Sequence, residues 1–375
     1  MKNISAYFVF SLVALSILLQ NCSGDASSAG NDNAAETSNS SANDYYTVDD
    51  FKTVEKFDSH IHLNTFETYY MEQAKEDNMR FLVIVDDRPF GLPMEEQQKI
   101  IVKQLKAFPD QIAYATTFSV KNFDSEGFVD ETIAYLKNSF ANGAIAVKVW
   151  KNVGMDLRDK DGKFVMIDHP KFDPILDYLA KNNIPLIGHL GEPKDCWLPL
   201  DSMTFHQGYY RSHPEYHMFL HPEYPSYEDQ INAKDNMLAK HPDLKFVGAH
   251  MGSLEWSLDE LADRLDRFPN MAVDLARMSN INYHAMIDWQ KTHDFFVKYQ
   301  DRLLYATDVQ VGESKDPAQM KKRAHESRIR YWNFFTTDEM FKISGKDTTC
   351  KGLKLPREVI DKIYRKNAEK WLPGV

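Results

Sequence analysis

The sequence has no excess of basic residues. Its 44 Lys and Arg residues face 55 Asp and Glu residues, which gives a net charge of −11, and no basic cluster occurs along the chain. Domains that bind nucleic acid need clustered Lys and Arg to neutralise phosphates. We therefore expect no nucleic-acid partner.

Cysteine is also scarce, with 3 residues in a chain of 375, at positions 22, 196 and 350. Small exported domains that depend on disulfides for stability carry more cysteines than this. One disulfide between Cys196 and Cys350 is an alternative in an oxidising compartment. Because these two cysteines are not part of any cluster, we expect two separate thiols.

The apolar run at the N-terminus, residues 6–19, is too short to span a bilayer comfortably. It follows Lys2 and ends in the letters LQNC, which resemble a bacterial lipoprotein signal. This resemblance implies a signal peptide over residues 1–21, a lipid on the Cys22 thiol, and an exported protein anchored to a membrane, periplasmic or at the cell surface. An ordinary secretory signal with an incidental cysteine is the alternative.

Residues 22–49 predict a flexible linker, because Ser, Asn, Ala and Gly dominate and little apolar surface is available to offset the entropy of ordering. The whole chain is 43% hydrophobic and 26% charged, which is ordinary for a globular protein. We expect one folded domain over residues 50–375.

Short β-branched and aromatic runs alternate with helical periodicity from residue 50 onward. The predicted strands are residues 53–61, 80–87, 112–120, 144–150, 185–190, 244–251, 271–277 and 302–309. Between them, segments such as residues 257–268 place apolar residues on one face at helical spacing. Strands that alternate with such helices predict a (β/α)8 TIM barrel. An open doubly wound sheet is the alternative, but no Gly-rich phosphate loop follows any strand.

The longest interruption between predicted elements is residues 196–230, which are rich in Pro, Tyr and His. Loops of this length in a compact domain are usually functional or disordered. Because this one follows the fifth strand, we expect it to lie over the barrel mouth and shape the substrate pocket. A surface excursion is the alternative. It contains His206, His213, His217 and His221, and we expect most of these four to be solvated.

Polar residues stand where the predicted strands end. They are His60 and His62 on the first strand, Lys148 on the fourth, His189 on the fifth, His250 on the sixth and Asp308 on the eighth. Barrel active sites lie at the carboxyl ends of the strands, so these side chains should converge. Residues i and i+2 of a strand point to the same side, so both histidines of His60-x-His62 can face one metal ion. Imidazole and carboxylate ligands favour zinc, with manganese, iron or cobalt as alternatives.

These ligands and several longer segments resemble the amidohydrolase superfamily, in particular its amidohydrolase-related branch. The resemblance covers residues 50–373 and rests on segments in a fixed order, which are DKDGKFVMIDHPKFDPI, PSYEDQ, KHPDLKFVGAHMGSLEW, RFPNMAVDLAR and NAEKWLPG. It implies a metal-dependent TIM-barrel enzyme whose metal ligands are His60, His62, His189 and Asp308.

The same resemblance implies two catalytic residues. Asp308 would move a proton as well as bind metal, and His250 would polarise a substrate carbonyl or bind a second metal ion. Lys148 occupies the position of a lysine that is carboxylated and bridges two metal ions in dinuclear relatives. In mononuclear relatives it is an ordinary barrel lysine, so one ion and two ions both stay open.

Three further residues are candidates for substrate binding: Trp150, Glu192 and Arg277. Arg277 ends the seventh strand and could pair with a substrate carboxylate through two hydrogen bonds, with a salt bridge that supports the loops as the alternative. Trp150 follows the fourth strand, where an aromatic ring lines a pocket or simply packs.

The expected reaction is hydrolysis of an amide, lactone or other ester of a small molecule by metal-activated water. The resemblance also implies an alternative, metal-dependent decarboxylation or hydration of a carboxylated small molecule. A non-catalytic lipoprotein that binds ligands at the cell surface is a third hypothesis, and it requires a broken ligand set. A homo-oligomer is compatible with the sequence, which does not indicate an oligomeric state.

Overall fold

The computed structural model describes residues 44–375. The predicted signal peptide, Cys22 and most of the predicted linker lie outside the described residues. The end of that linker packs against the folded domain: Tyr46 contacts Trp332 with ring centroids 5.4 Å apart, and η1 (Val48–Lys52) buries Phe51. Within the described part of the chain, no helix is both long and apolar enough to cross a membrane.

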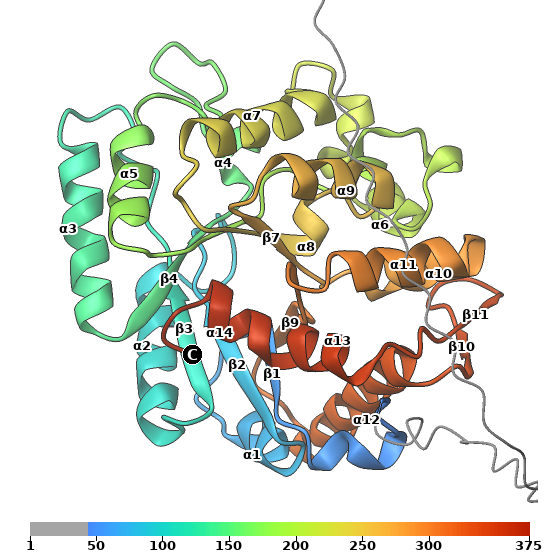
Figure 1. Cartoon of the computed structure of the whole chain (residues 1–375). Helices are drawn as coiled ribbons and strands as arrows, with labels where there is room; N and C mark the ends of the chain where they lie inside the picture. The colour runs from blue at the N-terminus through green and yellow to red at the C-terminus, as the bar shows by residue number, and fades with distance from the viewer. Residues whose placement is uncertain (1–43) are drawn as a thin grey trace, which may run out of the picture. The chain divides into compact units, whose positions relative to one another are not determined.

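A parallel sheet that closes into a barrel forms the centre of the domain (Figure 1). Its strands are β1 (Lys56–Leu63), β2 (Met79–Ile84), β3 (Ile112–Thr116), β4 (Ala144–Val149), β5 (Leu186–Gly188), β6 (Phe246–Gly248), β7 (Met271–Asp274), β8 (Leu303–Leu304) and β9 (Val309–Val311). Neighbours in the sheet follow the order β8-β7-β6-β5-β4-β3-β2-β1-β9. The predicted (β/α)8 barrel is confirmed.

The last predicted strand, residues 302–309, is interrupted. It gives β8 and β9, which together take the eighth place in the barrel. Val309 of β9 pairs with Ile61 of β1, and the backbone N–H of Ser59 donates to the carbonyl of Tyr305 over 2.9 Å. These contacts close the barrel and bring the first and last strands side by side.

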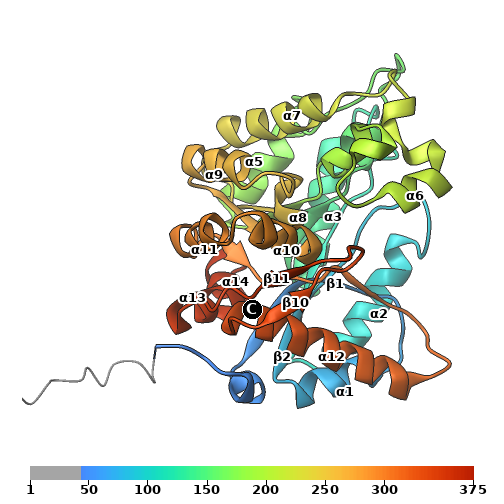
Figure 2. The same ribbon diagram turned by 90° about the vertical axis from the view of Figure 1, so that its right-hand side faces the viewer.

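Helices surround the sheet (Figures 1 and 2). The helices between β1 and β7 are α1 (Tyr69–Glu76), α2 (Met94–Ala107), α3 (Phe128–Ala141), α4 (Asn152–Met155), α5 (Asp173–Lys181), α7 (Tyr227–Lys240), α8 (Ala249–Gly252) and α9 (Leu258–Arg267). Those that follow are α10 (Met278–Ile287), α11 (Trp289–Lys298), α12 (Pro317–Thr336), α13 (Arg357–Asp361), η6 (Lys362–Lys366) and α14 (Asn367–Trp371). A hairpin of β10 (Met340–Lys342) and β11 (Thr349–Lys351) precedes α13.

The barrel interior is a packed core. Alternate residues of each strand point inward, and the cluster they form includes Phe57, Leu82, Ala113, Ala146, Ile187, Val247, Ala272 and Leu304. Ala368, Trp371 and Leu372 of the C-terminal segment belong to the same cluster. The second core lies between the strands and the surrounding helices. Polar side chains are therefore left to gather at the carboxyl ends of the strands, the active-site end of such barrels.

Residues 196–230, which we call the insertion, are folded as short helices rather than as a loop. These are the end of η2 (Lys194–Trp197), then η3 (Leu200–Ser202), α6 (Gln207–Ser212), η4 (Pro214–Tyr216) and η5 (Met218–Leu220), with the start of α7. They enclose a small core of Cys196, Met203, Tyr210 and Met218. Three of its four histidines, His206, His213 and His221, are partly exposed, in line with the expectation that most are solvated. His217 is buried, and its Nε2 lies 2.7 Å from the carbonyl oxygen of Leu198.

Cys196 and Cys350 are both buried free thiols, as expected for two separate cysteines. Burial raises the pKa of each thiol to about 11. Neither thiol is therefore a reactive thiolate near neutral pH.

Candidate metal centre

His60 and His62 lie together at the carboxyl end of β1. Both side chains point to the same side of the strand, and the Nε2 atom of each lies 3.4 Å from Oδ1 of Asp308. Asp308 sits between β8 and β9, where its backbone N–H donates to the carbonyl of His60 over 2.8 Å. The closure of the barrel thus brings together residues almost 250 positions apart.

His250 and Asp308 both adopt the left-handed backbone conformation, each with φ of 55°. L-residues rarely adopt this region, and it is found preferentially at functional sites. In α8, directly after β6, it turns the His250 ring so that Nε2 lies 3.6 Å from Oδ2 of Asp308. Donor atoms of His60, His250 and Asp308 all lie within 4.8 Å of one another, a spacing at which one metal ion can be held.

The outer nitrogens of these rings are held by the protein. Nδ1 of His60 lies 2.7 Å from Oδ2 of Asp274, Nδ1 of His62 lies 3.1 Å from the carbonyl of Ile84, and Nδ1 of His250 lies 3.3 Å from that of Ala276. A ring that donates its Nδ1 proton keeps the lone pair on Nε2. The three Nε2 atoms are therefore presented to the interior of the site.

Asp274, which is not among the residues predicted from the sequence, organises this site. Besides accepting from His60, its Oδ1 accepts the backbone N–H of His250 over 2.7 Å and that of Ala276 over 3.1 Å. Burial raises its pKa, but the interactions with His60, His250 and Lys148 outweigh burial and lower the pKa to about 2. The available signal was a single carboxylate in the apolar run MAVDLAR.

His189 extends the cluster beyond His250. The two rings lie with centroids 4.5 Å apart, and Nε2 of His189 is buried without a hydrogen-bond partner in the described part of the chain. Burial, and to a smaller extent the neighbouring His250 ring and Lys151, lower the pKa of His189 well below its ordinary value. Burial and Arg277 do the same for His250, so both rings are neutral near pH 7.

Lys148 of β4 also extends into the candidate metal centre. Its Nζ lies 3.4 Å from Nε2 of His60, and the side chain is fully buried. Burial lowers the pKa of this amine, which favours the unprotonated form that carboxylation requires. Asp308 is 30% exposed. Burial raises its pKa, but the electrostatic interactions with His60 and His250 outweigh burial and lower the pKa well below the ordinary value.

The family model described as Amidohydrolase matches residues 58–374. The chain belongs to the amidohydrolase family. It is therefore a metal-dependent enzyme of the amidohydrolase superfamily. No curated protein matches its sequence.

Several solved structures are similar to this amidohydrolase at low identity. 2,6-Dihydroxybenzoate decarboxylase from Rhizobium is 15% identical with a TM-score of 0.49, over 85% of this chain and 98% of that one. 4-Oxalomesaconate hydratase from Rhodopseudomonas palustris is 12% identical with a TM-score of 0.46, over 85% and 96%. A putative amidohydrolase from Staphylococcus aureus is 11% identical with a TM-score of 0.43, over 85% and 99%. The family assignment rests on the family model and not on these structures.

The residues at the centre of this amidohydrolase fit a divalent metal ion. His189 offers a buried Nε2 that no group within residues 44–375 satisfies, His60, His62 and His250 offer Nε2 lone pairs, and Asp308 offers a carboxylate. Buried polar atoms normally have a hydrogen-bond partner, so an orphaned imidazole nitrogen indicates a missing ligand. Neutral imidazoles with one carboxylate suit zinc and related transition metals.

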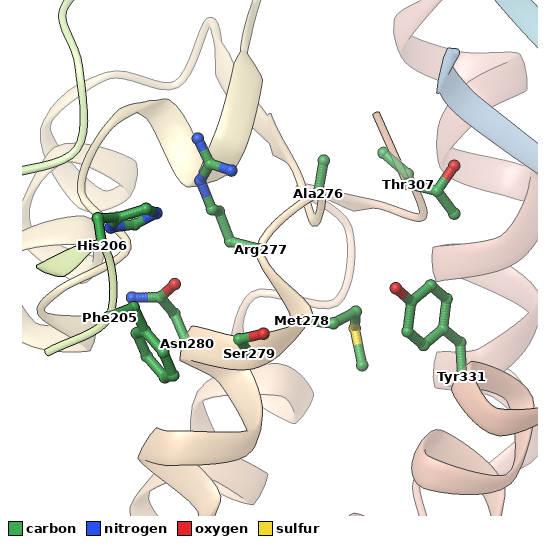
Figure 3. Close-up of a pocket in the computed structure, with 10 residues that line it drawn as sticks. Phe205, His206, Ala276, Arg277, Met278, Ser279, Asn280, Thr307 and Tyr331 are labelled. Carbon is green, nitrogen blue, oxygen red and sulfur yellow. The ribbon is translucent and has the colours of Figure 1, made fainter. Parts of the chain in front are cut away.

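The three predicted substrate-binding residues line two separate cavities beside the metal centre. Trp150 and Glu192 line one of about 520 Å³, where Glu192 pairs with Lys151. Arg277, at the start of α10, lines another of about 230 Å³ (Figure 3). The insertion contributes to both, with Tyr209 in the first and His206 in the second. It thus lies where a pocket-shaping segment was expected.

Proposed function

We propose that this amidohydrolase hydrolyses an amide, lactone or other ester of a small molecule. The observation that carries the proposal is the convergence of four imidazoles and the Asp308 carboxylate, with Nε2 of His189 buried and without a partner among the described residues. His60, His62, His189 and Asp308 would hold one divalent ion, with zinc favoured. Lys148 and His250 are the residues that would hold a second ion.

When bound, a divalent ion supplies Lewis acidity: it polarises a carbonyl oxygen and lowers the pKa of water from 15.7 to about 7. The protein supplies the remaining groups. Asp308 is ionised because its pKa is lowered, and it is partly exposed, so it can accept a proton from water and return it to the leaving group. His250 is neutral and its Nδ1 is held by the carbonyl of Ala276, so its Nε2 lone pair can accept a hydrogen bond from water or bind a second metal ion.

Metal-dependent decarboxylation or hydration of a carboxylated molecule is the second candidate. One observation favours it: Nε of Arg277 is buried without a hydrogen-bond partner in the described residues, which leaves the guanidinium available for an anion. The two reactions are separated by product analysis in ¹⁸O-labelled water. Release of CO2 without ¹⁸O in the organic product would reject hydrolysis in favour of decarboxylation. An uncleaved product that gains one ¹⁸O would reject hydrolysis in favour of hydration.

The first experiment measures metal content and activity together. We expect the purified chain to hold at least one equivalent of zinc, manganese, iron or cobalt and to cleave members of a panel of esters, lactones and amides. Asp308→Asn should lower kcat by at least about 100-fold, in the range of general acid–base contributions. His221→Gln, a partly buried histidine of the insertion that lines neither cavity, is the matched control. Absence of both stoichiometric metal and activity would support the non-catalytic hypothesis.

We also propose export and lipid anchoring at Cys22, from the signal-like N-terminus alone. Labelled palmitate should be incorporated into the full chain and lost in Cys22→Ala. Label that persists in the variant would exclude this site.

A further inference from the structure

The cavity at the ends of β7 and β8 is rich in hydrogen-bond donors. It measures about 230 Å³, and its polar lining includes His206, Arg277, Ser279 and Asn280 (Figure 3). In that view His206 and Asn280 lie on the same side as Arg277, while Met278, Thr307 and Tyr331 lie on the other. The cavity thus has a polar, cationic wall facing a less polar one.

Arg277 provides the fixed positive charge of this wall. Its Nε is buried, yet it has no hydrogen-bond partner in the described part of the chain. A buried guanidinium donor without an acceptor is costly, unless a ligand satisfies it. The nearby carboxylate of Glu255 does not do so: Glu255 is itself buried, and its Oε2 also lacks a partner.

The insertion adds His206 in a fixed orientation. Nδ1 of His206 lies 3.0 Å from Oδ2 of Asp195, and Asp195 also accepts the backbone N–H groups of Phe205 over 2.9 Å and Thr204 over 3.1 Å. Burial raises the pKa of Asp195, but these hydrogen bonds outweigh it and lower the pKa below its ordinary value. Asp195 thus fixes the His206 ring where it lines the cavity.

The donor cavity adjoins the metal centre. Ala276, which lines it, accepts from the His250 ring over 3.3 Å, and the charge of Arg277 lowers the pKa of both His250 and His189. A molecule anchored in this cavity would therefore extend directly to the metal ligands.

We infer that this cavity is the subsite for a carboxylate group of the substrate, bound by Arg277, Asn280 and the His206 of the insertion. A carboxylate matches the planar fork of a guanidinium with two parallel hydrogen bonds. Asn280 is buried in the same wall and can donate through its amide. The inference depends on the proposed function in one respect: it assumes that the bound carboxylate belongs to the substrate.

The test is binding of benzoate to the zinc-loaded full chain at pH 6, measured by isothermal titration calorimetry, with benzamide as the uncharged analogue. We expect benzamide to bind at least tenfold more weakly. Arg277→Gln should weaken benzoate binding at least tenfold, and His206→Ala severalfold. Glu255→Gln should leave benzoate binding unchanged or strengthen it, because a carboxylate that competes for Arg277 is removed. His221→Gln is the control with unchanged affinity.

Zinc content, measured on every sample, separates this inference from the proposed function. Benzoate that bound only to zinc would bind Arg277→Gln and His206→Ala as tightly as the parent chain, and that result would overturn the subsite. Equal binding of benzamide would overturn it as well. A chain that bound benzoate through Arg277 but held no metal would keep the subsite and reject the proposed function. If Arg277→Gln failed to fold, His206→Ala would still decide, because His206 lies on the insertion and is 28% exposed.

Discussion

At the scale of single residues, the candidate metal centre depends on the groups that hold its histidine rings in place. His60, His62 and His250 could each rotate or exchange tautomers, yet each has its Nδ1 held by an acceptor. Two of these acceptors are backbone carbonyls, which substitution cannot remove. The third is Asp274, which also fixes the backbone at His250. Asp274 is therefore the side chain through which the ligand geometry can be perturbed without touching a ligand.

Asp274→Asn is expected to weaken metal binding by about 10- to 100-fold, the usual effect of removing a carboxylate that orients a metal-bound histidine. The amide can donate a proton to Nδ1 of His60, which would place the ring proton on Nε2, the atom needed by the metal. Competition with a fluorescent zinc chelator measures the affinity. Asp195→Asn, which removes a carboxylate outside the metal centre, should leave it unchanged. Equal affinity in both variants would contradict this role.

At the scale of elements, the barrel was predictable because its strands are short apolar runs spaced by amphipathic helices. The predicted helix over residues 257–268 appears as α9, with Ser257 accepting from the backbone N–H of Glu260 and Leu261 fully buried. The positions of His60, His62 and Asp308 followed from the strand ends. Their use as ligands stays a prediction until metal is measured.

Other features of the site have no local sequence signal. The left-handed turn at His250 is stabilised by contacts with Asp274, 24 positions away, and no propensity of the letters AHMG indicates it. The donor cavity joins Arg277 to His206, which a separate segment supplies. The sequence of the insertion predicts a loop, because its helices are short and its core is built from scattered Tyr, Met and Cys side chains. The turn at His250, the donor cavity and the fold of the insertion all depend on tertiary contacts, which the local sequence pattern does not show.

The turn after β6 gives a prediction at this scale. A Cβ on Gly248 would lie 2.7 Å from Cα of Gly252, so backbone would have to move. Gly248→Ala should lower the free energy of unfolding by about 1–3 kcal/mol, as overpacking does, and should weaken metal binding by displacing His250. Chemical denaturation and chelator competition measure the two effects.

Gly208→Ala is the matched control for that variant. No atom lies within 4 Å of the Cβ it would add, and Gly208 lies within the helix α6. Its stability should be unchanged or higher by up to about 1 kcal/mol. Equal effects of the two substitutions would show that the turn has no special packing.

At the scale of the whole molecule, the metal should couple to folding, because its proposed ligands lie on β1, directly after β5 and in the β8–β9 connection, and meet only in the closed barrel. Free zinc at 100 times its dissociation constant should raise the free energy of unfolding by about 2.7 kcal/mol. Thermal unfolding with and without a chelator measures this. Magnesium at the same concentration should have a smaller effect, since it prefers oxygen ligands. An unfolding temperature insensitive to zinc would contradict the coupling.

Lys56 gives the whole fold a dependence on pH that is separate from the metal. It is fully buried at the start of β1, where Nζ donates to the carbonyls of Phe51 and Val54. Burial lowers its pKa from 10.5 to about 7, against the opposing pull of Asp77. Between these two values the unfolded chain holds a proton that the folded chain has released. The free energy of unfolding should therefore rise with pH between these two pKa values, by at most about 1.4 kcal/mol per pH unit. Below the lower value, Lys56 should add no dependence on pH.

The test of this dependence compares the chain with Lys56→Met in urea denaturation from pH 6 to pH 9, with chelator present throughout. Methionine fills a similar volume and cannot titrate, so other groups cancel in the difference between the two stabilities. That difference should be level below about pH 7 and then shift in favour of the lysine form as the pH rises. A difference that stays level across the whole range would mean that Lys56 keeps its proton inside the fold, stabilised as a cation by the carbonyls of Phe51 and Val54 and by the Phe51 ring, whose centroid lies 4.3 Å from Nζ.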